Sequence, residues 1–288
     1  MASPNKDIRE LLQFALERLS FAGIDTPLIE ARILLCHAAR LKQTDLIAHP
    51  EMILNDDATV RYIDWVERRA FREPLAYIIG EKEFYGFPFH VTPGVLIPRP
   101  ETELLVEYAI EFLKTRTRWS VAADLGTGSG AIAISVLRHI PDCIFHAVDI
   151  SRKALRIAVR NSIEAEVVDR IRFHHGDMLL DPLVDVKCDL IVSNPPYIPT
   201  DVISMLEPEV GVHEPHSALN GGVDGLDFYR HIAASAPRII KPGGALAVEI
   251  GIDQSAPVVE YFEMSGFTDI SIGKDYAGID RIISGIWG

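Results

Sequence analysis

With 288 residues, 48% of them hydrophobic, the chain can bury a sizeable core in one large domain or in two modest ones. Its net charge is −13, and because 17 Lys and Arg stand against 27 Asp and Glu from Phe84 onward, we expect no direct nucleic-acid partner. No stretch is long and apolar enough to span a membrane, the segment Met1–Glu10 is too polar for a secretory signal, and three scattered cysteines form no disulfide framework, so we expect a cytoplasmic protein.

The first part of the chain, residues 1–80, is predicted to be a small helical bundle. Apolar residues recur at helical spacing within Ile8–Leu19, with charged residues on the opposite face. Thr26-Pro27 is typical of an N-cap followed by the first helical residue, and Thr44 and Asn55 are expected to start further helices. We interpret the bundle as a substrate-docking module, and the alternative is a helical cap with no partner of its own.

A β-hairpin and a linker are predicted for residues 81–100. Aromatic residues alternate around Gly86 within Glu83–Val91, which is typical of two short strands and a turn. Arg99 then stands between two prolines, which make a rigid arm. We expect Arg99 to line a site and bind substrate, although it can also simply anchor the helix that is expected from about Glu101 through Leu113.

From Val121 onward, predicted strands alternate with predicted helices, which is typical of a parallel sheet in an α/β fold. The expected strands are Val121–Leu125, Ile144–Val148, Ile171–Phe173, Asp189–Val192, Ala245–Ile250, Thr268–Ile272 and Asp280–Ile286. The expected helices are Ala131–His139, Arg152–Val159, Gly225–Ile240 and Asp253–Ser265. We assign the catalytic domain to residues 101–288.

A glycine-rich turn, residues 126–130, follows the first of these strands and indicates a nucleotide-like cofactor. Its spacing also fits the dinucleotide fingerprint, which keeps an NAD enzyme as an alternative. Asp124 would lie badly beside a pyrophosphate, but it suits the amino group of a cationic methyl donor, directly or through the turn. Asp149 ends the next strand, where a carboxylate can bind both ribose hydroxyls under either interpretation. The residues of the turn that we expect to bind the cofactor are Gly126, Thr127, Gly128, Ser129 and Gly130.

Asp177 and Met178 follow the third strand. The Asp177 carboxylate can accept a hydrogen bond from an adenine amino group while Met178 covers the ring, so we predict that both bind the cofactor. The alternative is a plain turn at the end of the strand. Two histidine pairs, His174-His175 and His213 with His216, lack a spacing that requires a metal, and we expect no metal site.

The segment Asn194–Tyr197, Asn-Pro-Pro-Tyr, stops the fourth strand and forms a stiff loop at its carboxyl end. The Asn194 side-chain oxygen and the Pro195 carbonyl can accept hydrogen bonds from a planar –NH2 group, and Tyr197 offers a flat face. Such a loop suits an amide or an exocyclic base nitrogen that must face an electrophile. We therefore predict that Asn194, Pro195 and Tyr197 are catalytic and that Pro196 joins them in binding substrate.

Together with this loop, several motifs resemble the peptide chain release factor N5-glutamine methyltransferases, from about Pro74 to the C-terminus. The motifs are Pro74–Ile78, Leu96–Glu103, Asp124–Gly130, Ser193–Pro199, Gly221–Leu226 and Asp275–Arg281. The resemblance implies a Rossmann-like class I methyltransferase sheet with a small N-terminal helical bundle joined by a β-hairpin. It implies S-adenosylmethionine as cofactor and the glutamine of the Gly-Gly-Gln motif in class I release factors as substrate. At Met178, many relatives have an aromatic residue instead.

By this resemblance, Gly126–Gly130, Asp149 and Asn194 contact the methyl donor, and Asn194–Tyr197 holds the glutamine. The implied reaction is an in-line displacement in which the amide nitrogen attacks the methyl group. A glutamine methyltransferase of a ribosomal protein and a nucleic-acid amino methyltransferase remain alternatives. An NAD-dependent oxidoreductase would explain the glycine turn but not the Asn-Pro-Pro-Tyr loop.

Overall fold

The computed structural model describes residues 6–180, 183 and 185–288, which form two compact units. The first unit comprises the chain up to Gly80 together with Glu207–His213, and the second comprises Glu81–Leu206 and Glu214–Gly288. Half of the polar stretch Met1–Glu10, on which the expectation about a secretory signal rests, lies outside the described residues. Within the part of the chain that is described, no helix has the length and apolar character needed to cross a membrane.

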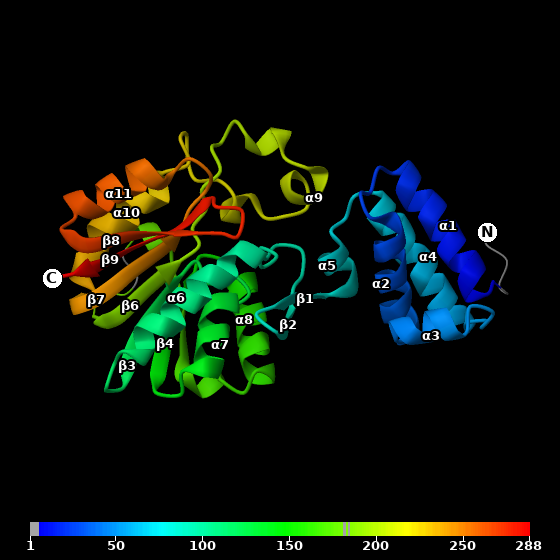
Figure 1. Ribbon diagram of the computed structural model, residues 1–288, viewed down its shortest axis with the longest axis horizontal. Helices are drawn as coiled ribbons and strands as arrows, with labels where there is room; N and C mark the ends of the chain where they lie inside the picture. Colours follow the sequence, from blue (N-terminus) through cyan, green and yellow to red (C-terminus); the bar gives the residue numbers. More distant parts are fainter. Residues whose placement is uncertain (1–5, 181–182, 184) are drawn as a thin grey trace. The chain divides into compact units, whose positions relative to one another are not determined.

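The first unit is helical (Figure 1). Its helices are α1 (Ile8–Phe21), α2 (Pro27–Ala39), α3 (Gln43–Ala48), α4 (Asp56–Ala70), α5 (Leu75–Ile79) and the short α9 (Pro208–Gly211). The caps predicted for α2 and α4 are present at Thr26 and Asn55, and the Asn55 side chain accepts a hydrogen bond from the Ala58 amide. Helix α3 begins at Gln43 rather than at Thr44, because the Lys42 amide donates to the Asp45 carboxylate and places the N-cap at Lys42.

Two arginines of the first unit, the buried Arg69 and the half-buried Arg72, hold its discontinuous segment Glu207–His213. Arg69 on α4 is 6% exposed and forms ion pairs with Glu30 and, at 2.8 Å, with Glu209. Arg72 contacts Glu209 at 2.8 Å and Glu207 at 3.0 Å. The sequence analysis assigned this segment to the 101–288 domain, because nothing in its local pattern identifies partners about 140 residues away.

The second unit begins with the predicted hairpin, which is confirmed. Strands β1 (Glu81–Phe84) and β2 (Phe87–His90) pair antiparallel. Tyr85 and Gly86 between them have φ of 49° and 68°, which is the left-handed geometry of a tight two-residue hairpin turn. Phe84 and Phe89 are buried and pack edge to face, with 5.9 Å between their ring centroids. Both belong to the core cluster of the main sheet, which attaches the hairpin to it.

The main sheet has seven strands in the order β5-β4-β3-β6-β7-β9-β8. The strands are β3 (Ser120–Leu125), β4 (Cys143–Asp149), β5 (Ile171–His175), β6 (Cys188–Ser193), β7 (Ile240–Glu249), β8 (Phe267–Lys274) and β9 (Asp280–Trp287). The first five are parallel, and β9 runs antiparallel to both neighbours. The predicted α/β class is therefore confirmed. Strand β7 begins at Ile240 rather than Ala245, because Ile240 already pairs with Cys188 of β6.

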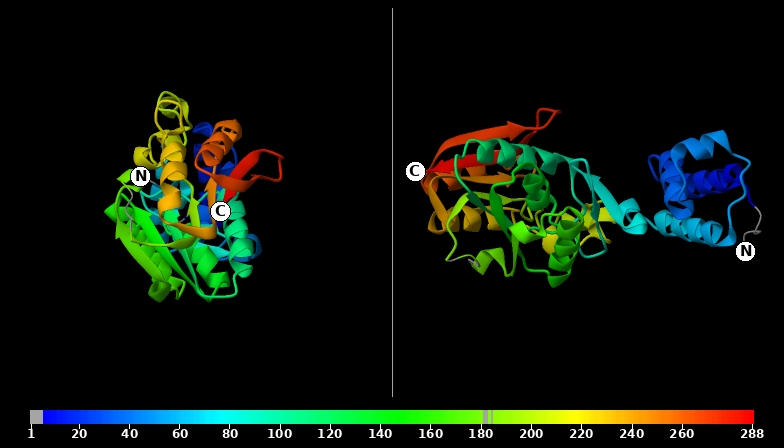
Figure 2. Two further views of the ribbon diagram at one scale, coloured as in Figure 1. Left: turned by 90° about the vertical axis from the view of Figure 1, so that its left-hand side faces the viewer. Right: turned by 90° about the horizontal axis from the view of Figure 1, so that it is seen from below.

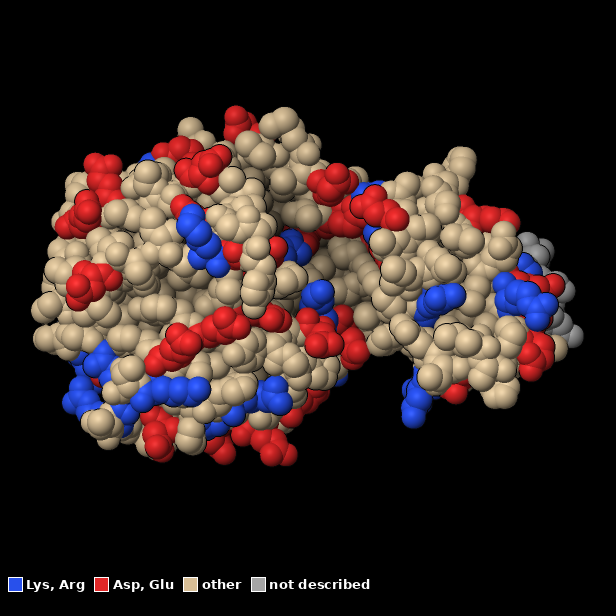
Figure 3. All heavy atoms as spheres, in the orientation of Figure 1, with Lys and Arg blue, Asp and Glu red and all other residues tan. Residues whose placement is uncertain are grey.

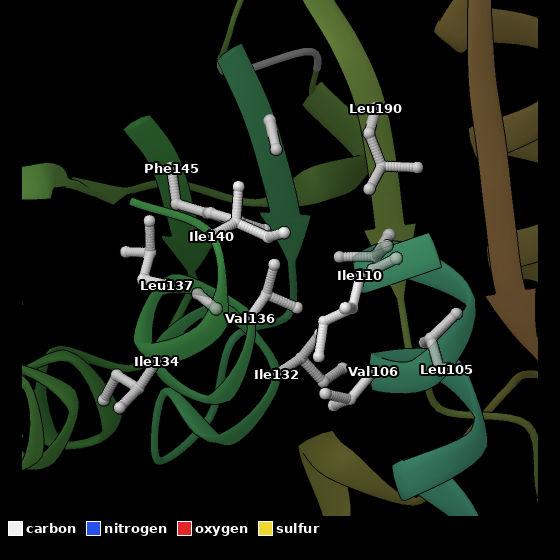
Figure 4. Packing of buried hydrophobic residues seen from close by; sticks show 14 of the residues in the cluster. Leu105, Val106, Ile110, Ile132, Ile134, Val136, Leu137, Ile140, Phe145 and Leu190 are labelled. Atoms are coloured by element: carbon white, nitrogen blue, oxygen red, sulfur yellow. The ribbon is translucent and has the colours of Figure 1, made fainter. Parts of the chain in front are cut away.

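Helices cover both faces of this sheet (Figures 1 and 2). One face carries α6 (Glu103–Lys114), α7 (Ala131–His139) and α8 (Arg152–Glu164), and the other carries α10 (Asp227–Ser235) and α11 (Ser255–Met264). Short 3-10 turns lie at Pro100–Thr102, Val168–Arg170, Met178–Leu180, Ile203–Met205, His216–Ala218 and Ala236–Arg238. Figure 4 shows Val106 and Ile110 of α6 meeting Ile132 of α7 over the sheet. This buried packing fixes the strand ends from which the loops emerge.

Candidate functional site

A cavity of about 390 Å³ lies in the second unit, at the carboxyl ends of four adjacent parallel strands. Its walls include Gly126–Ser129 after β3, Asp149–Ser151 after β4, Gly176–Leu179 after β5 and Asn194 after β6. Open α/β sheets bind ligands in this position, where the strand order reverses, because the connections diverge there and leave a crevice.

The turn after β3 is shaped by glycine. Gly126 and Gly128 have φ of 79° and 57°, in the left-handed region that side chains disfavour. The Gly126 and Thr127 amides both donate to the Val148 carbonyl at 2.9 Å, which ties the turn to β4. A Cβ added at Gly126 would lie 2.7 Å from the Met178 Cε atom. The turn therefore forms a close-fitting backbone wall, as the cradle of a nucleotide-like cofactor requires.

Asp124 is fully buried beneath this turn and does not line the cavity. Its Oδ2 accepts a hydrogen bond from the Thr127 hydroxyl at 2.7 Å. Burial raises the Asp124 pKa to about 7, although the bond from Thr127 opposes that shift. Any influence of Asp124 on a ligand therefore acts through the turn rather than by direct contact. Gly130, the last residue of the turn, also lies outside the wall, because it packs against Ile134 at the start of α7.

Asp149 lines the cavity and organises two chain segments. One carboxylate oxygen accepts from the Gly128 amide and the other from the Ser151 amide, both at 2.8 Å. Burial raises the Asp149 pKa, and these two amide bonds oppose the rise. The Ser151 hydroxyl in turn caps α8 by accepting from the Ala154 amide. Each Asp149 oxygen retains acceptor capacity, so the carboxylate can still bind a pair of hydroxyls.

Asp177 and Met178 also line the cavity. The Asp177 carboxylate accepts from the Leu179 amide at 2.9 Å, and Met178 packs against the core cluster that α10 and α11 cover. Together with Ile150, these residues give one wall an apolar surface and a single carboxylate, which suits a planar ring that carries an amino group.

The loop after β6 places Asn194 and Pro196 in the cavity wall, but not Pro195 or Tyr197. Pro195 is buried below the surface, and Tyr197 packs against the same core cluster as Met178. Burial raises the Tyr197 pKa to about 12, and its carbonyl accepts from the Gln254 side chain at 3.0 Å. Tyr197 is only partly buried, so the stacking of a substrate on its flat face stays a prediction.

Behind Asn194 lies a buried hydrogen-bonded chain that the sequence analysis did not identify. The Asn194 Nδ2 donates to the Thr102 hydroxyl at 3.0 Å, and that hydroxyl donates to the Glu249 Oε2 at 2.6 Å. Glu249 is 3% exposed, and burial raises its pKa to about 7. Thr102 also lines the cavity.

Arg99 lines the cavity as predicted, and its charge is paired. Its Nη2 contacts the Oε1 of Glu214 at 2.7 Å, and the Glu214 side chain is 1% exposed. Burial raises the Glu214 pKa, while the Arg99 charge and hydrogen bond oppose that rise. The pair therefore fixes the chain on both sides of the opening rather than leaving a free cation at the site.

Further wall residues were not predicted as site residues; most are apolar or small, and they come from loops, from the end of β4 and from the first turns of α7, α8 and α10. They are Gly94, Val95, Leu96, Pro98, Ala131, Ile132, Val148, Ala154, Pro215, His216, Ser217, Ala218, Asn220 and Phe228. Among the residues that the structure describes, no group of three or more His, Cys, Asp or Glu side chains is arranged to hold a metal ion. His174 instead stacks on His146, with a nitrogen–nitrogen distance of 2.9 Å.

Comparisons with known proteins agree with this geometry. A family model described as the PrmC N-terminal domain matches residues 10–80, and the methyltransferase small domain matches residues 101–205. The release factor glutamine methyltransferase of Caulobacter vibrioides is 42% identical over 94% of this chain and 93% of its own length. That of Geobacter sulfurreducens is 41% identical over 96% of each chain. A solved methyltransferase structure from Pyrococcus furiosus shares the fold, with a TM-score of 0.52 and 20% identity over 77% of this chain and 97% of that one.

Proposed function

Because this chain belongs to the release factor glutamine methyltransferase family, we propose that it methylates the side-chain nitrogen, N5, of the glutamine in the Gly-Gly-Gln motif of class I release factors. The proposed methyl donor is S-adenosylmethionine. The observation that carries this proposal is that the glycine turn after β3 and Asn194 after β6 line one cavity. A substrate that works on the ribosome would place the reaction in the cytoplasm.

The donor side of the cavity would be formed by Gly126–Ser129, Asp149, Asp177 and Met178. The close backbone of the turn, the Asp149 carboxylate and the apolar wall around Met178 support this assignment. When bound, S-adenosylmethionine supplies a methyl group made electrophilic by its sulfonium charge. The buried Asp124 would hold the turn in shape through Thr127.

The acceptor side would be formed by Asn194, which lines the cavity, and by the backbone carbonyl of Pro195, whose ring is buried behind the wall. An amide nitrogen is a poor nucleophile, because its lone pair is delocalised into the carbonyl group. Two acceptors on its –NH2 group draw electron density toward the nitrogen and fix its orientation, and positioning of this kind can contribute about 7–11 kcal/mol. We assign no dedicated base, because the proton can leave to solvent once the nitrogen carries the extra methyl group.

We further propose that the first unit helps to dock the release factor. A factor that works against ribosomal RNA should present a basic surface around its glutamine, and the acidic excess of this chain, most of which lies from Phe84 onward, complements such a surface. On the face shown in Figure 3, Lys and Arg side chains of the second unit gather along its lower left edge, and a row of Asp and Glu side chains lies above them. The net acidic balance of the sequence, rather than this face alone, favours a protein substrate over a nucleic acid.

A parallel assay tests the proposed function. Labelled S-adenosylmethionine is mixed with the full chain and either a release factor, the same factor with its Gly-Gly-Gln glutamine changed to alanine, a ribosomal protein or DNA. We expect label only on the unchanged factor, at the glutamine N5 by mass spectrometry. Label on the altered factor, the ribosomal protein or the DNA would contradict the proposed substrate. Tight NAD binding without a response to the methyl donor in calorimetry would contradict the proposed cofactor.

A further inference from the structure

Three side chains from distant parts of the sequence are linked behind the cavity. Asn194 follows β6, Thr102 precedes α6 and Glu249 ends β7, and the two hydrogen bonds between them span 92 and 147 residues of sequence. Thr102 is 4% exposed and Glu249 is 3% exposed. Glu249 is further held by its backbone carbonyl, which accepts from the Tyr229 hydroxyl at 3.0 Å. The chain of bonds is thus largely sealed from water, apart from the end that Asn194 presents.

The direction of these bonds follows from counting protons. A threonine hydroxyl has one proton, and an ionised carboxylate can only accept, so the Thr102 proton is committed to Glu249. Thr102 can then only accept from Asn194, which turns the –NH2 end of the Asn194 amide toward Thr102. The Asn194 side-chain oxygen is then not used by Thr102. Because Asn194 lines the cavity, this oxygen can accept a hydrogen bond from a bound ligand.

We propose that Glu249, acting through Thr102, is a positioning residue that sets the Asn194 amide with its oxygen available to the substrate nitrogen. This inference rests on the proposed function, because it gives the acceptor its role in methylation. A reversed Asn194 amide would offer –NH2 to the –NH2 of the glutamine, and two donors cannot bond to each other. The orientation of one amide therefore decides whether the substrate is held productively.

Protonation of Glu249 should reverse the direction of the two hydrogen bonds that link it to Asn194 through Thr102. A neutral carboxyl group can donate to Thr102, whose own proton is then free to bond to the Asn194 oxygen. The charged groups around Glu249 are Glu101, Arg99 and Arg281, and the Tyr197 and Tyr229 rings also face it. Burial raises the Glu249 pKa to about 7, so we expect the methylation rate to rise with pH through this range.

Two substitutions at Thr102 test the inference. Thr102→Val keeps the shape but removes the hydroxyl, and it should lower kcat about 10- to 100-fold with a smaller change in the KM for the release factor. Thr102→Ser restores the hydroxyl and should recover most of that rate. Thr59→Val is the matched control, because Thr59 is also 4% exposed and its hydroxyl bonds to the Asn55 carbonyl in the first unit. The control should keep the unsubstituted kcat.

Glu249→Gln tests the carboxylate itself. Glutamine can donate or accept at Thr102, so the rise in kcat near pH 7 should disappear and the plateau rate should fall. The side-chain amide signal of Asn194 in NMR, identified by its absence in Asn194→Ala, gives a readout that needs no substrate. In the unsubstituted chain this signal should move with pH with a midpoint near 7, and in Glu249→Gln it should not move.

The outcomes separate this inference from the proposed function. If the unsubstituted protein does not methylate the release factor, the proposed function is contradicted. The NMR titration still tests the hydrogen bonds between Asn194, Thr102 and Glu249 in that case. An active enzyme whose Thr102→Val variant keeps its full kcat, or whose Glu249→Gln variant keeps the pH-dependent rise, overturns the inference alone. If Thr102→Val does not fold, Thr102→Ser and the Glu249→Gln pH profile decide.

Discussion

The two sides of the cavity are built in opposite ways. The side formed by Gly126–Ser129 is made of backbone, and its shape depends on the absence of side chains at two glycines. The side around Asn194 is made of side chains, each held by a partner more than 90 residues away in sequence. The first construction governs how closely a ligand can approach, and the second governs how a reacting group is oriented. Changes on the first side should therefore mainly alter affinity, and changes on the second should mainly alter rate.

The largest effect should come from Asn194→Ala. Loss of a preorganised polar contact at a reacting group lowers kcat about 100- to 1,000-fold, or roughly 3–4 kcal/mol. Asn194→Asp should fail as well, because it removes the amide donor to Thr102 and adds a charge. Single-turnover methylation of the release factor measures the loss, and thermal unfolding should change little. A fully active Asn194→Ala enzyme would contradict the claim that side chains around Asn194 orient the reacting group.

The next effect concerns the carboxylate beneath the glycine turn. The folded pKa of Asp124, about 7, exceeds its ordinary value of 3.8, so its contribution to stability is fully present below about pH 4 and is lost as pH rises through 7. Each pKa unit corresponds to about 1.4 kcal/mol. Asp124→Asn should therefore reduce the fall in the free energy of unfolding between about pH 5 and about pH 8 by up to a few kcal/mol. Urea unfolding at about pH 5 and about pH 8 measures the difference.

Asp189 provides the control of opposite sign. Burial opposes the shift, but hydrogen bonds from Lys241 and the Val121 amide hold the Asp189 pKa below its usual value. Its stabilisation is present above the unfolded pKa and is lost as pH falls, so Asp189→Asn should destabilise the protein at about pH 8. If the free energy of unfolding depends on pH in the same way in Asp124→Asn and in Asp189→Asn, the explanation by opposite pKa shifts of the two carboxylates is wrong.

A smaller effect is expected for Gly126→Ala. The new Cβ would meet Met178 and sit at a left-handed φ, so affinity for S-adenosylmethionine should fall about tenfold while kcat at saturation changes less. Gly278→Ala has a similar φ of +81° but open space around the added Cβ, which makes it the matched control for backbone strain alone. Calorimetry with the demethylated product measures both. Equal affinity losses would show that strain, rather than the close wall, is responsible.

The smallest effect lies outside both sides of the cavity. If acidic residues attract a basic release factor, its KM should rise a few-fold with increasing salt, because screening slows association. A short neutral peptide containing Gly-Gly-Gln should show a flatter response. Steady-state rates on both substrates across one salt series provide the measurement. If the KM values for the release factor and for the peptide rise equally with salt, electrostatic attraction does not contribute to substrate choice. The cavity would then determine that choice by itself.

The sequence was informative wherever structure is local. The Asn55 cap, the hairpin turn at Gly86 and the alternation of strands and helices are each encoded within a few residues, and all are confirmed. The glycine turn after β3 and Asp149 at the end of β4 follow from the same alternation and line the cavity, and their binding of a cofactor stays a prediction. Such features depend on backbone geometry that neighbouring residues determine.

Features made by long-range packing could not be predicted in this way. Nothing in the local sequence of Thr102 or Glu249 indicates that they bond to each other, and only the folded topology brings them behind Asn194. The partly buried Tyr197 ring also packs against a core cluster built from distant parts of the sequence, while its role toward a substrate stays a prediction. Side-chain partners of this kind depend on the full topology, which local sequence patterns do not determine.

The discontinuous first unit has a consequence for how the chain is made. A ribosome synthesises Arg69 about 140 residues before Glu209, so the emerging helical bundle has Glu30 but lacks the second acidic partner of this buried arginine. The bundle reaches its final composition only after most of the main sheet's parallel strands have been synthesised. A protein cut at Gly80 would likewise separate Arg69 and Arg72 from Glu207 and Glu209, and each fragment would carry charges that were paired in the whole chain.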